Sequence, residues 1–378
     1  MIGVINGMRQ LKIEPVIYEY DGIMEFIKSF RVGKDDLIIT SKKLYDEYLK
    51  YHIKESAVIF TENYGEGYPS DNMVESIYEN IKRIAYERVI AVGGNSILEI
   101  GKILALKNIS PVIDLFENRL EVIKEKELVL VPTVCGTGTE ITNICTLYFK
   151  GENSKRELNI DELYADSAVL IPELLESIPF NVFVENSITA FIHAVDSYLS
   201  PKSTKYTRLF SEKAIEIFLK GYRTIILKGK DSFDSLFKEF LFGSNYSGIA
   251  LANTGYSIIH SIGYPLSVNK EISYKESDYA VFTAVLRMYV KNRNDININS
   301  LKILLCDLLE CDENKICDEL EYILSNVSYK RKISEYGIEE TELNNLAVSA
   351  VEIQSANGFI KNTIFSKDEV YGLYESIY

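Results

Sequence analysis

Two glycine-containing segments, each directly after an apolar run, hold the residues best suited to bind a phosphate group. The first segment is RVIAVGGNSILEIGK, which places Gly93, Gly94, Asn95 and Ser96 between an apolar run and a helical pattern. Free N–H groups at the start of a helix attract anions, and glycine lets a phosphate approach the backbone closely. An ordinary strand-to-helix turn remains an alternative, because the segment lacks the full G-x-G-x-x-G pattern.

The second segment, VPTVCGTGTEITN, follows another apolar run and carries several hydroxyl groups on a permissive backbone. Thr133, Thr137 and Thr142 surround Gly136 and Gly138. Ligands of open α/β sheets bind at the carboxyl ends of the strands. Two such loops at neighbouring strand ends therefore predict one groove for a dinucleotide.

The elements that position these loops alternate in type along the chain. The runs DLIIT, SAVIF and RVIAVGG are rich in β-branched residues, and amphipathic helical patterns lie between them. This order predicts a Rossmann-like parallel sheet with helices on both faces, in an α/β domain over residues 1–172. Beyond it the apolar positions recur at helical spacing, which predicts an all-α domain over residues 173–378.

The composition excludes several classes of protein. The 378 residues carry 55 Asp and Glu against 41 Lys and Arg, a net charge of −14 that disfavours nucleic acid and anionic lipid as partners. No apolar run is long enough for a membrane span, and the N-terminal residues lack a secretory signal pattern. The five cysteines form no disulfide framework. We therefore expect a cytoplasmic protein.

Longer segments resemble the iron-containing (group III) alcohol dehydrogenases, most closely the 4-hydroxybutyrate dehydrogenase branch, over nearly the whole chain. GGNSILEIGK is similar to the family's Gly-Gly-Gly-Ser-x-x-Asp-x-x-Lys motif, and PTVCGTGTE to Pro-Thr-x-x-Gly-Thr-Gly-Ser-Glu. SITAFIHAVDSYLSP and GIALANTGYSIIHSIGYPLS are similar to its helical segments. The resemblance implies the dehydroquinate synthase-like fold, and pyrophosphate and groove contacts from Gly93, Gly94, Asn95, Ser96, Thr133, Thr137 and Thr142.

The resemblance also implies a metal site, because family members hold Fe²⁺ or Zn²⁺ with one Asp and three His. His193 and His260 are retained at two of these positions, whereas Thr189 replaces the Asp and Tyr274 replaces the last His. A neutral hydroxyl and a phenol are poor ligands for these ions. We expect weak metal binding or none.

The reaction implied by the resemblance is hydride transfer between NAD or NADP and a small aldehyde or alcohol, such as succinic semialdehyde and 4-hydroxybutyrate. Without a metal, Lys275, His193 and His260 are candidates to stabilise the oxyanion. Tyr264, four residues after His260 on one helix face, is a candidate proton donor if its pKa is lowered. The related maleylacetate reductases work without the metal.

The choice between NAD and NADP stays open. Ser41 ends the run DLIITS, where many NAD-using relatives have an Asp that binds the ribose. Lys42 and Lys43 follow it and favour a phosphate, although a solvated turn explains them equally well.

Two other functions remain as alternatives. A non-catalytic paralogue would keep the fold and dinucleotide binding, and its supporting feature is that the cofactor loops are nearly intact while the metal site is not. A different reaction, as in the dehydroquinate synthase or glycerol dehydrogenase relatives, is the third candidate. Family members commonly dimerise, so the resemblance also implies a homodimer.

Overall fold

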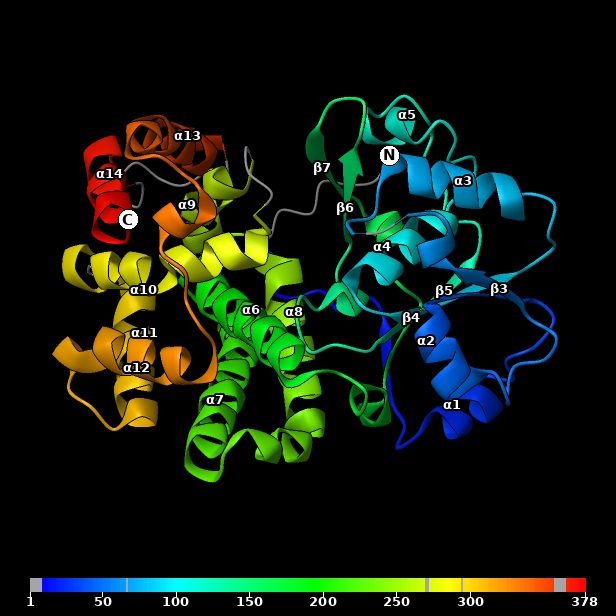
Figure 1. Ribbon diagram of the computed structural model, residues 1–378, viewed down its shortest axis with the longest axis horizontal. Coiled ribbons are helices and arrows are strands. Elements are labelled where there is room, and N and C mark those ends of the chain that lie inside the picture. The colour runs from blue at the N-terminus through cyan, green and yellow to red at the C-terminus, as the bar shows by residue number, and fades with distance from the viewer. Residues whose placement is uncertain (1–8, 66, 269–271, 294, 357–364) are drawn as a thin grey trace.

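A six-stranded parallel sheet forms the centre of the N-terminal half of the chain (Figure 1). The computed structural model describes residues 9–65, 67–268, 272–293, 295–356 and 365–378. The strand order is β1-β8-β5-β4-β2-β3, and all neighbouring strands pair in parallel. The strands are β1 (Val16–Glu19), β2 (Asp36–Thr40), β3 (Ala57–Phe60), β4 (Arg88–Gly93), β5 (Glu127–Pro132) and β8 (Ser167–Leu170).

Successive side chains of the central strands enter two separate cores, one on each face of the sheet. In β2, Leu37 and Ile39 pack into one core and Ile38 into the other. The first core is covered by α3 (Asp71–Ile81), α4 (Asn95–Leu104) and α5 (Val112–Phe116), and the second by α1 (Ile23–Ser29). A short α2 (Lys42–Leu44) continues as a π-helical turn over Tyr45–Leu49. Because both faces are covered, the strands are apolar runs rather than alternating patterns, and the predicted doubly covered sheet is confirmed.

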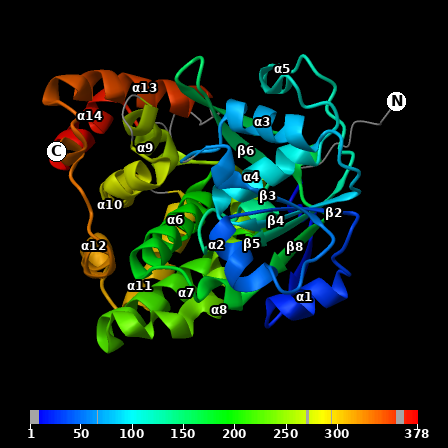
Figure 2. The same cartoon turned by 45° about the vertical axis from the view of Figure 1, so that its right-hand side comes forward.

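An antiparallel hairpin lies outside this sheet and was not foreseen from the sequence. It consists of β6 (Ile144–Phe149) and β7 (Ser154–Asn159), paired from Ile144 with Asn159 to Phe149 with Ser154. In Figures 1 and 2 the hairpin rises from the sheet domain on the side that faces the C-terminal helices. It therefore adds a wall at the junction of the two halves.

The C-terminal half is helical, as predicted. Its long central helix α6 is buried along most of its length, so the other helices pack around it in one continuous core. Among the described residues, no helix is both long and apolar enough to cross a membrane. The helices are α6 (Phe180–Leu199), α7 (Lys205–Lys228), α8 (Phe237–Thr254), α9 (Ile258–Val268), α10 (Tyr274–Asn292), α11 (Ile296–Leu309), α12 (Ile316–Val327), α13 (Leu343–Ala356) and α14 (Lys367–Ser376).

The two halves meet at a close approach between two glycines. Gly138, in the loop after β5, has φ of 64° and lies against Gly248 of α8. A Cβ added to Gly138 would lie 2.5 Å from the Cα of Gly248, and one added to Gly248 would lie 2.8 Å from the Cα of Gly138. Both positions therefore need glycine for the loop to pack against α8.

Substituting Gly248→Ala is expected to lower the free energy of unfolding by about 1–3 kcal/mol, because the new methyl group overlaps the backbone of Gly138 as well as the buried side chain of Ile141. Thermal unfolding followed by circular dichroism measures this loss. Gly372→Ala in α14 is the matched control, since its Cβ would meet nothing within 4 Å. An equal effect of the two substitutions would contradict the packing argument.

Candidate active site

The first predicted phosphate loop forms an open cradle at the start of α4. Gly94 is the N-cap residue in an extended conformation, and no side chain caps the helix there. A cavity of about 340 Å³ borders this helix start. A Cβ on Gly94 would meet nothing within 4 Å. The free N–H groups of α4 are therefore available to an anion. The lining of the cavity at this helix start includes Ser41, Thr61, Glu62, Gly94, Asn95 and Ser96.

Glu62 is a cavity residue that the sequence reasoning missed. It follows β3 and lies beside Ser41, and its carboxylate accepts a hydrogen bond from the backbone N–H of Lys42. The Ser41 hydroxyl accepts from the backbone N–H of Leu44 at 3.2 Å. The Lys42 ammonium pairs with Asp46 at 2.7 Å. The carboxylate of Glu62 therefore lies beside Ser41 and Lys42, the residues that the sequence suggested for contact with the cofactor ribose or its phosphate.

The second predicted loop is tied to the first by hydroxyl groups. Thr137 donates to Oδ1 of Asn95 at 2.5 Å, and Thr139 donates to the same oxygen. Thr137 and Thr142 line a smaller cavity together with Asn95. Thr133 is buried and does not line either of these two cavities. The two loops are therefore joined by direct hydrogen bonds through Asn95.

A buried lysine of α4 holds the second loop from beneath. The ammonium of Lys102 donates to the carbonyl of Thr142 at 2.7 Å, to its hydroxyl at 3.1 Å and to the carbonyl of Ile144 at 2.8 Å. Burial lowers the pKa of Lys102 to about 8 and raises that of Glu99 to about 7. These three hydrogen bonds from Lys102 therefore fix the position of the second loop.

A cluster of aromatic rings lies next to these loops. Tyr256 stacks on His260 with ring centroids 4.1 Å apart, and its ring lies 5.6 Å from that of His193. Tyr264 and Tyr274 lie 5.5 and 6.3 Å from His260. The structure thus brings together four residues singled out from the sequence, and Tyr256 is an addition to them.

The cluster contacts the first phosphate loop directly. Nδ2 of Asn95 donates to the phenol oxygen of Tyr274 at 3.5 Å, and Tyr256 and Tyr274 line the same small cavity as Thr137. Hence the ring cluster and the two loops adjoin one another.

Asp278 orients His260 and was missed from the sequence. Its Oδ2 lies 2.9 Å from Nδ1 of His260, across the packed helices α9 and α10. Burial alone would lower the pKa of His260, but the carboxylates of Asp278, Asp196 and Glu157 outweigh burial and raise it. Asp278 lies four residues after Tyr274 in the fragment SYKESDY, one helical turn away, and this spacing was the signal for it.

Asp196 fixes the start of α9. Its carboxylate accepts from the backbone N–H groups of Ser257 at 2.7 Å and Ile259 at 2.8 Å. Burial raises the pKa of Asp196 to about 7. This carboxylate on α6 therefore caps the helix that carries His260, next to the helix face that carries His193.

The pKa of Tyr264 shifts in the direction opposite to the one that a proton donor at this position would need. Burial, and then the charge of Glu157, raise the pKa of Tyr264 rather than lowering it. A phenol with a raised pKa stays protonated near neutral pH. Tyr264 is therefore suited to donate a hydrogen bond, and the lowered pKa on which its role as a proton donor depended is not found.

The residues around the two imidazoles do not fit a divalent metal. The hydroxyl of Thr189 donates to the carbonyl of Glu185 at 3.0 Å, and Nδ1 of His260 is engaged by Asp278. Burial, followed by the charges of His260 and Lys275, lowers the pKa of His193 to about 3. Within the described ranges, no group of three or more His, Cys, Asp or Glu side chains could hold a metal ion.

Lys275 lies beside the second loop. Its ammonium donates to Oδ1 of Asn186 at 2.7 Å, and a Cβ on Gly136 would lie 2.8 Å from the same oxygen. Burial lowers the pKa of Lys275. Its charge reaches His193, whose pKa it lowers further.

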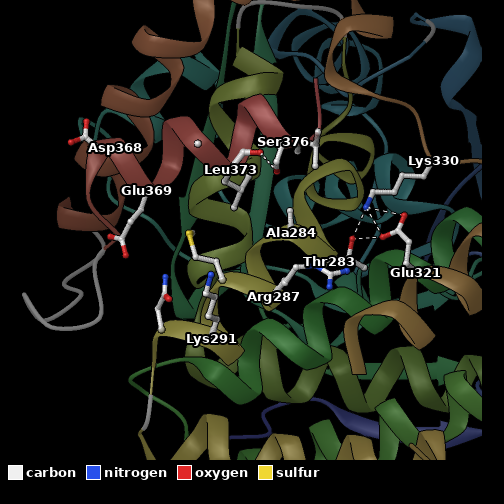
Figure 3. Close-up of a pocket in the computed structure, with 14 residues that line it drawn as sticks. Thr283, Ala284, Arg287, Lys291, Glu321, Lys330, Asp368, Glu369, Leu373 and Ser376 are labelled. Carbon is white, nitrogen blue, oxygen red and sulfur yellow. Dashed lines mark hydrogen bonds and ion pairs between the residues drawn. The ribbon is translucent and has the colours of Figure 1, made fainter. Parts of the chain in front are cut away.

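A second large cavity lies away from these residues, between α10, α12 and α14 (Figure 3). Its volume is about 620 Å³, and side chains of both charge signs line it. Lys330 pairs with Glu321 at 3.1 Å and donates to Thr283 at 2.7 Å. These bonds hold the segment after α12 against α10, which is a structural role.

Comparisons with known proteins agree with the resemblance. The family model described as iron-containing alcohol dehydrogenase matches residues 16–172, and that of the Fe-containing alcohol dehydrogenase family, C-terminal, matches residues 183–378. The chain is 38% identical to 4-hydroxybutyrate dehydrogenase of Clostridium kluyveri over 98% of this chain and 100% of that protein.

Solved structures share the fold at lower identity. Sulfoacetaldehyde reductase from Bifidobacterium kashiwanohense in complex with NAD+ superposes with a TM-score of 0.82 at 16% identity, covering 98% of this chain and 99% of that one. Maleylacetate reductase from Agrobacterium tumefaciens gives 0.78 at 14% identity, covering 99% and 98%.

Proposed function

The chain belongs to the iron-containing alcohol dehydrogenase family, and we propose that it transfers hydride between a nicotinamide dinucleotide and a small aldehyde or alcohol. One observation carries the proposal. The uncapped start of α4 at Gly94 opens onto a cavity, and the next residue, Asn95, contacts Tyr274 of the ring cluster. A pyrophosphate on that helix start would direct the nicotinamide toward His260.

The substrate pair that we propose is succinic semialdehyde and 4-hydroxybutyrate. The relative from Clostridium kluyveri, which matches over its full length, is named for that alcohol.

The proposed reduction needs a hydrogen-bond donor and a proton, because hydride addition turns the carbonyl oxygen into an alkoxide. Bound NADH would supply the hydride for the carbonyl carbon, and the resulting alkoxide would need one proton to become the alcohol. We assign these roles to His260, held by Asp278, and to the protonated phenol of Tyr264 beside it. Lys275 adds positive charge nearby. No step requires a metal ion.

NADH is the proposed cofactor rather than NADPH, because of Glu62. A carboxylate beside the adenosine end of the groove binds ribose hydroxyls and repels a 2′-phosphate. Substituting Glu62→Gln is expected to improve kcat/KM with NADPH about tenfold relative to NADH, or ~1.4 kcal/mol. Initial rates with both cofactors measure the ratio. Glu47→Gln, an acidic residue outside the cavity, is the control, and an unchanged ratio in Glu62→Gln would refute this assignment.

The decisive experiment follows NADH oxidation with succinic semialdehyde and other aldehydes, using protein treated with a chelator and assayed for metal by mass spectrometry. Turnover by metal-free protein supports the proposal. NADH binding without turnover of any aldehyde would favour the second candidate, a non-catalytic paralogue. The observation behind that candidate is the loss of two metal ligands while the cofactor cradle remains open.

A further inference from the structure

A cavity of about 660 Å³ lies between the β6–β7 hairpin and α9. Tyr148, Lys150 and Lys155 of the hairpin region line one side, and Tyr264 and Ile272 line the other. Among the described lining residues there are two lysines and no carboxylate. In a chain with a net charge of −14, this concentration of positive charge is suited to an anionic ligand.

Lys155 is the better placed of the two lysines. Its ammonium lies 4.1 Å from the ring centroid of Tyr68, a distance typical of a cation–π contact. Burial lowers its pKa, and no described carboxylate forms an ion pair with it. By contrast, Lys12 and Lys124 of the same half each pair with an Asp. A partly buried ammonium that faces a cavity keeps donors free for a ligand.

The cavity adjoins the ring cluster. Tyr264 lines the cavity, and its ring lies 5.5 Å from that of His260. Ser273, the residue before Tyr274, is close enough to the phenol of Tyr68 to affect its pKa, which places the start of α10 near the wall that holds Lys155. Lys155 therefore faces the same cavity as Tyr264, which borders the proposed reaction centre.

We propose that Lys155 binds the distal carboxylate of the substrate and so selects ω-carboxylated aldehydes. This inference rests on the proposed function, because it assigns the substrate class of that site. The ammonium and the carboxylate form a charge-assisted hydrogen bond, and the Tyr68 ring keeps the ammonium directed into the cavity. Lys150 adds a second positive charge at the wall.

The test compares succinic semialdehyde with butanal, an uncharged aldehyde of equal chain length. Lys155→Met is expected to raise KM for succinic semialdehyde about 10- to 50-fold, with a change below about threefold for butanal. Lys155→Arg should recover part of the preference. Lys126→Met is the matched control, because Lys126 also lies over a tyrosine ring, at 5.3 Å from Tyr86, but outside the cavity. Equal losses with both aldehydes would overturn the inference.

A binding measurement separates this inference from the proposed function. Calorimetry with 4-hydroxybutyrate, in the presence of NADH, needs no turnover. Binding to the wild type that is lost in Lys155→Met supports the anion subsite even if no aldehyde is reduced, in which case only the proposed reaction fails. Binding that is unchanged in Lys155→Met, or absent from the wild type, would overturn the subsite.

Discussion

Replacing Thr189 by Asp together with Tyr274 by His is expected to create a stoichiometric site for Fe²⁺ or Zn²⁺. The first change places a carboxylate one helical turn before His193, on the same face of α6. The second adds an imidazole within reach of the cluster around His260. Together they restore one Asp and three His, and the carboxylate supplies the negative charge that two neutral imidazoles lack.

The expected gain in metal affinity is at least about 100-fold, or ~3 kcal/mol. Metal content after anaerobic loading, measured by plasma mass spectrometry, and titration calorimetry check it. Thr189→Asn with Tyr274→Phe is the matched double control, since neither new side chain binds these ions well. One equivalent of metal in the wild type would show that ligands other than those identified complete the site.

The side chains at the two replaced ligand positions form hydrogen bonds with other groups of the protein. Thr189 satisfies its hydroxyl on its own helix, and Tyr274 is held by Asn95. Tyr256 packs against both imidazoles. Nδ1 of His260 is occupied by its hydrogen bond with Asp278. Helices α6, α9 and α10, which carry the positions of the family's metal ligands, here surround the aromatic cluster of Tyr256 and its neighbours.

The sheet and the cofactor loops could be predicted because their signals are local. β2 has the bounds of the run DLIIT, and the glycines follow their strands as the parallel arrangement requires. The hairpin could not be predicted in the same way, because its strands pair with each other and belong to no βαβ unit. Lys155, which lies in this hairpin, was therefore not recognised as a candidate from the sequence.

The ring cluster was predictable only through the resemblance. His193 and His260 are 67 positions apart in the sequence, and only the packing of α6 against α9 brings them to one ring, Tyr256. Glu62 and Asp278 were missed for a related reason. Each acts on a partner from a neighbouring element, Lys42 and His260, and spacing along one helix or strand carries no information about such pairs.

Substituting Gly94→Val is expected to weaken NADH binding at least 100-fold while leaving the fold intact. The valine side chain would project into the space that the pyrophosphate needs, because a Cβ on Gly94 meets nothing within 4 Å. The extended backbone there, with φ of −74°, accepts a β-branched residue. The loss of glycine at the N-cap costs about 1 kcal/mol at most.

Calorimetric titration with NADH, alongside thermal unfolding, checks both halves of this expectation. Gly151→Val is the matched control: its Cβ also meets nothing within 4 Å, and it lies in the hairpin turn away from the cradle. Loss of binding in Gly94→Val alone, with similar melting temperatures for the two variants, places the pyrophosphate on the start of α4. Undiminished binding would mean that the dinucleotide lies elsewhere, and the route from the cradle through Asn95 to the ring cluster would then lose its support.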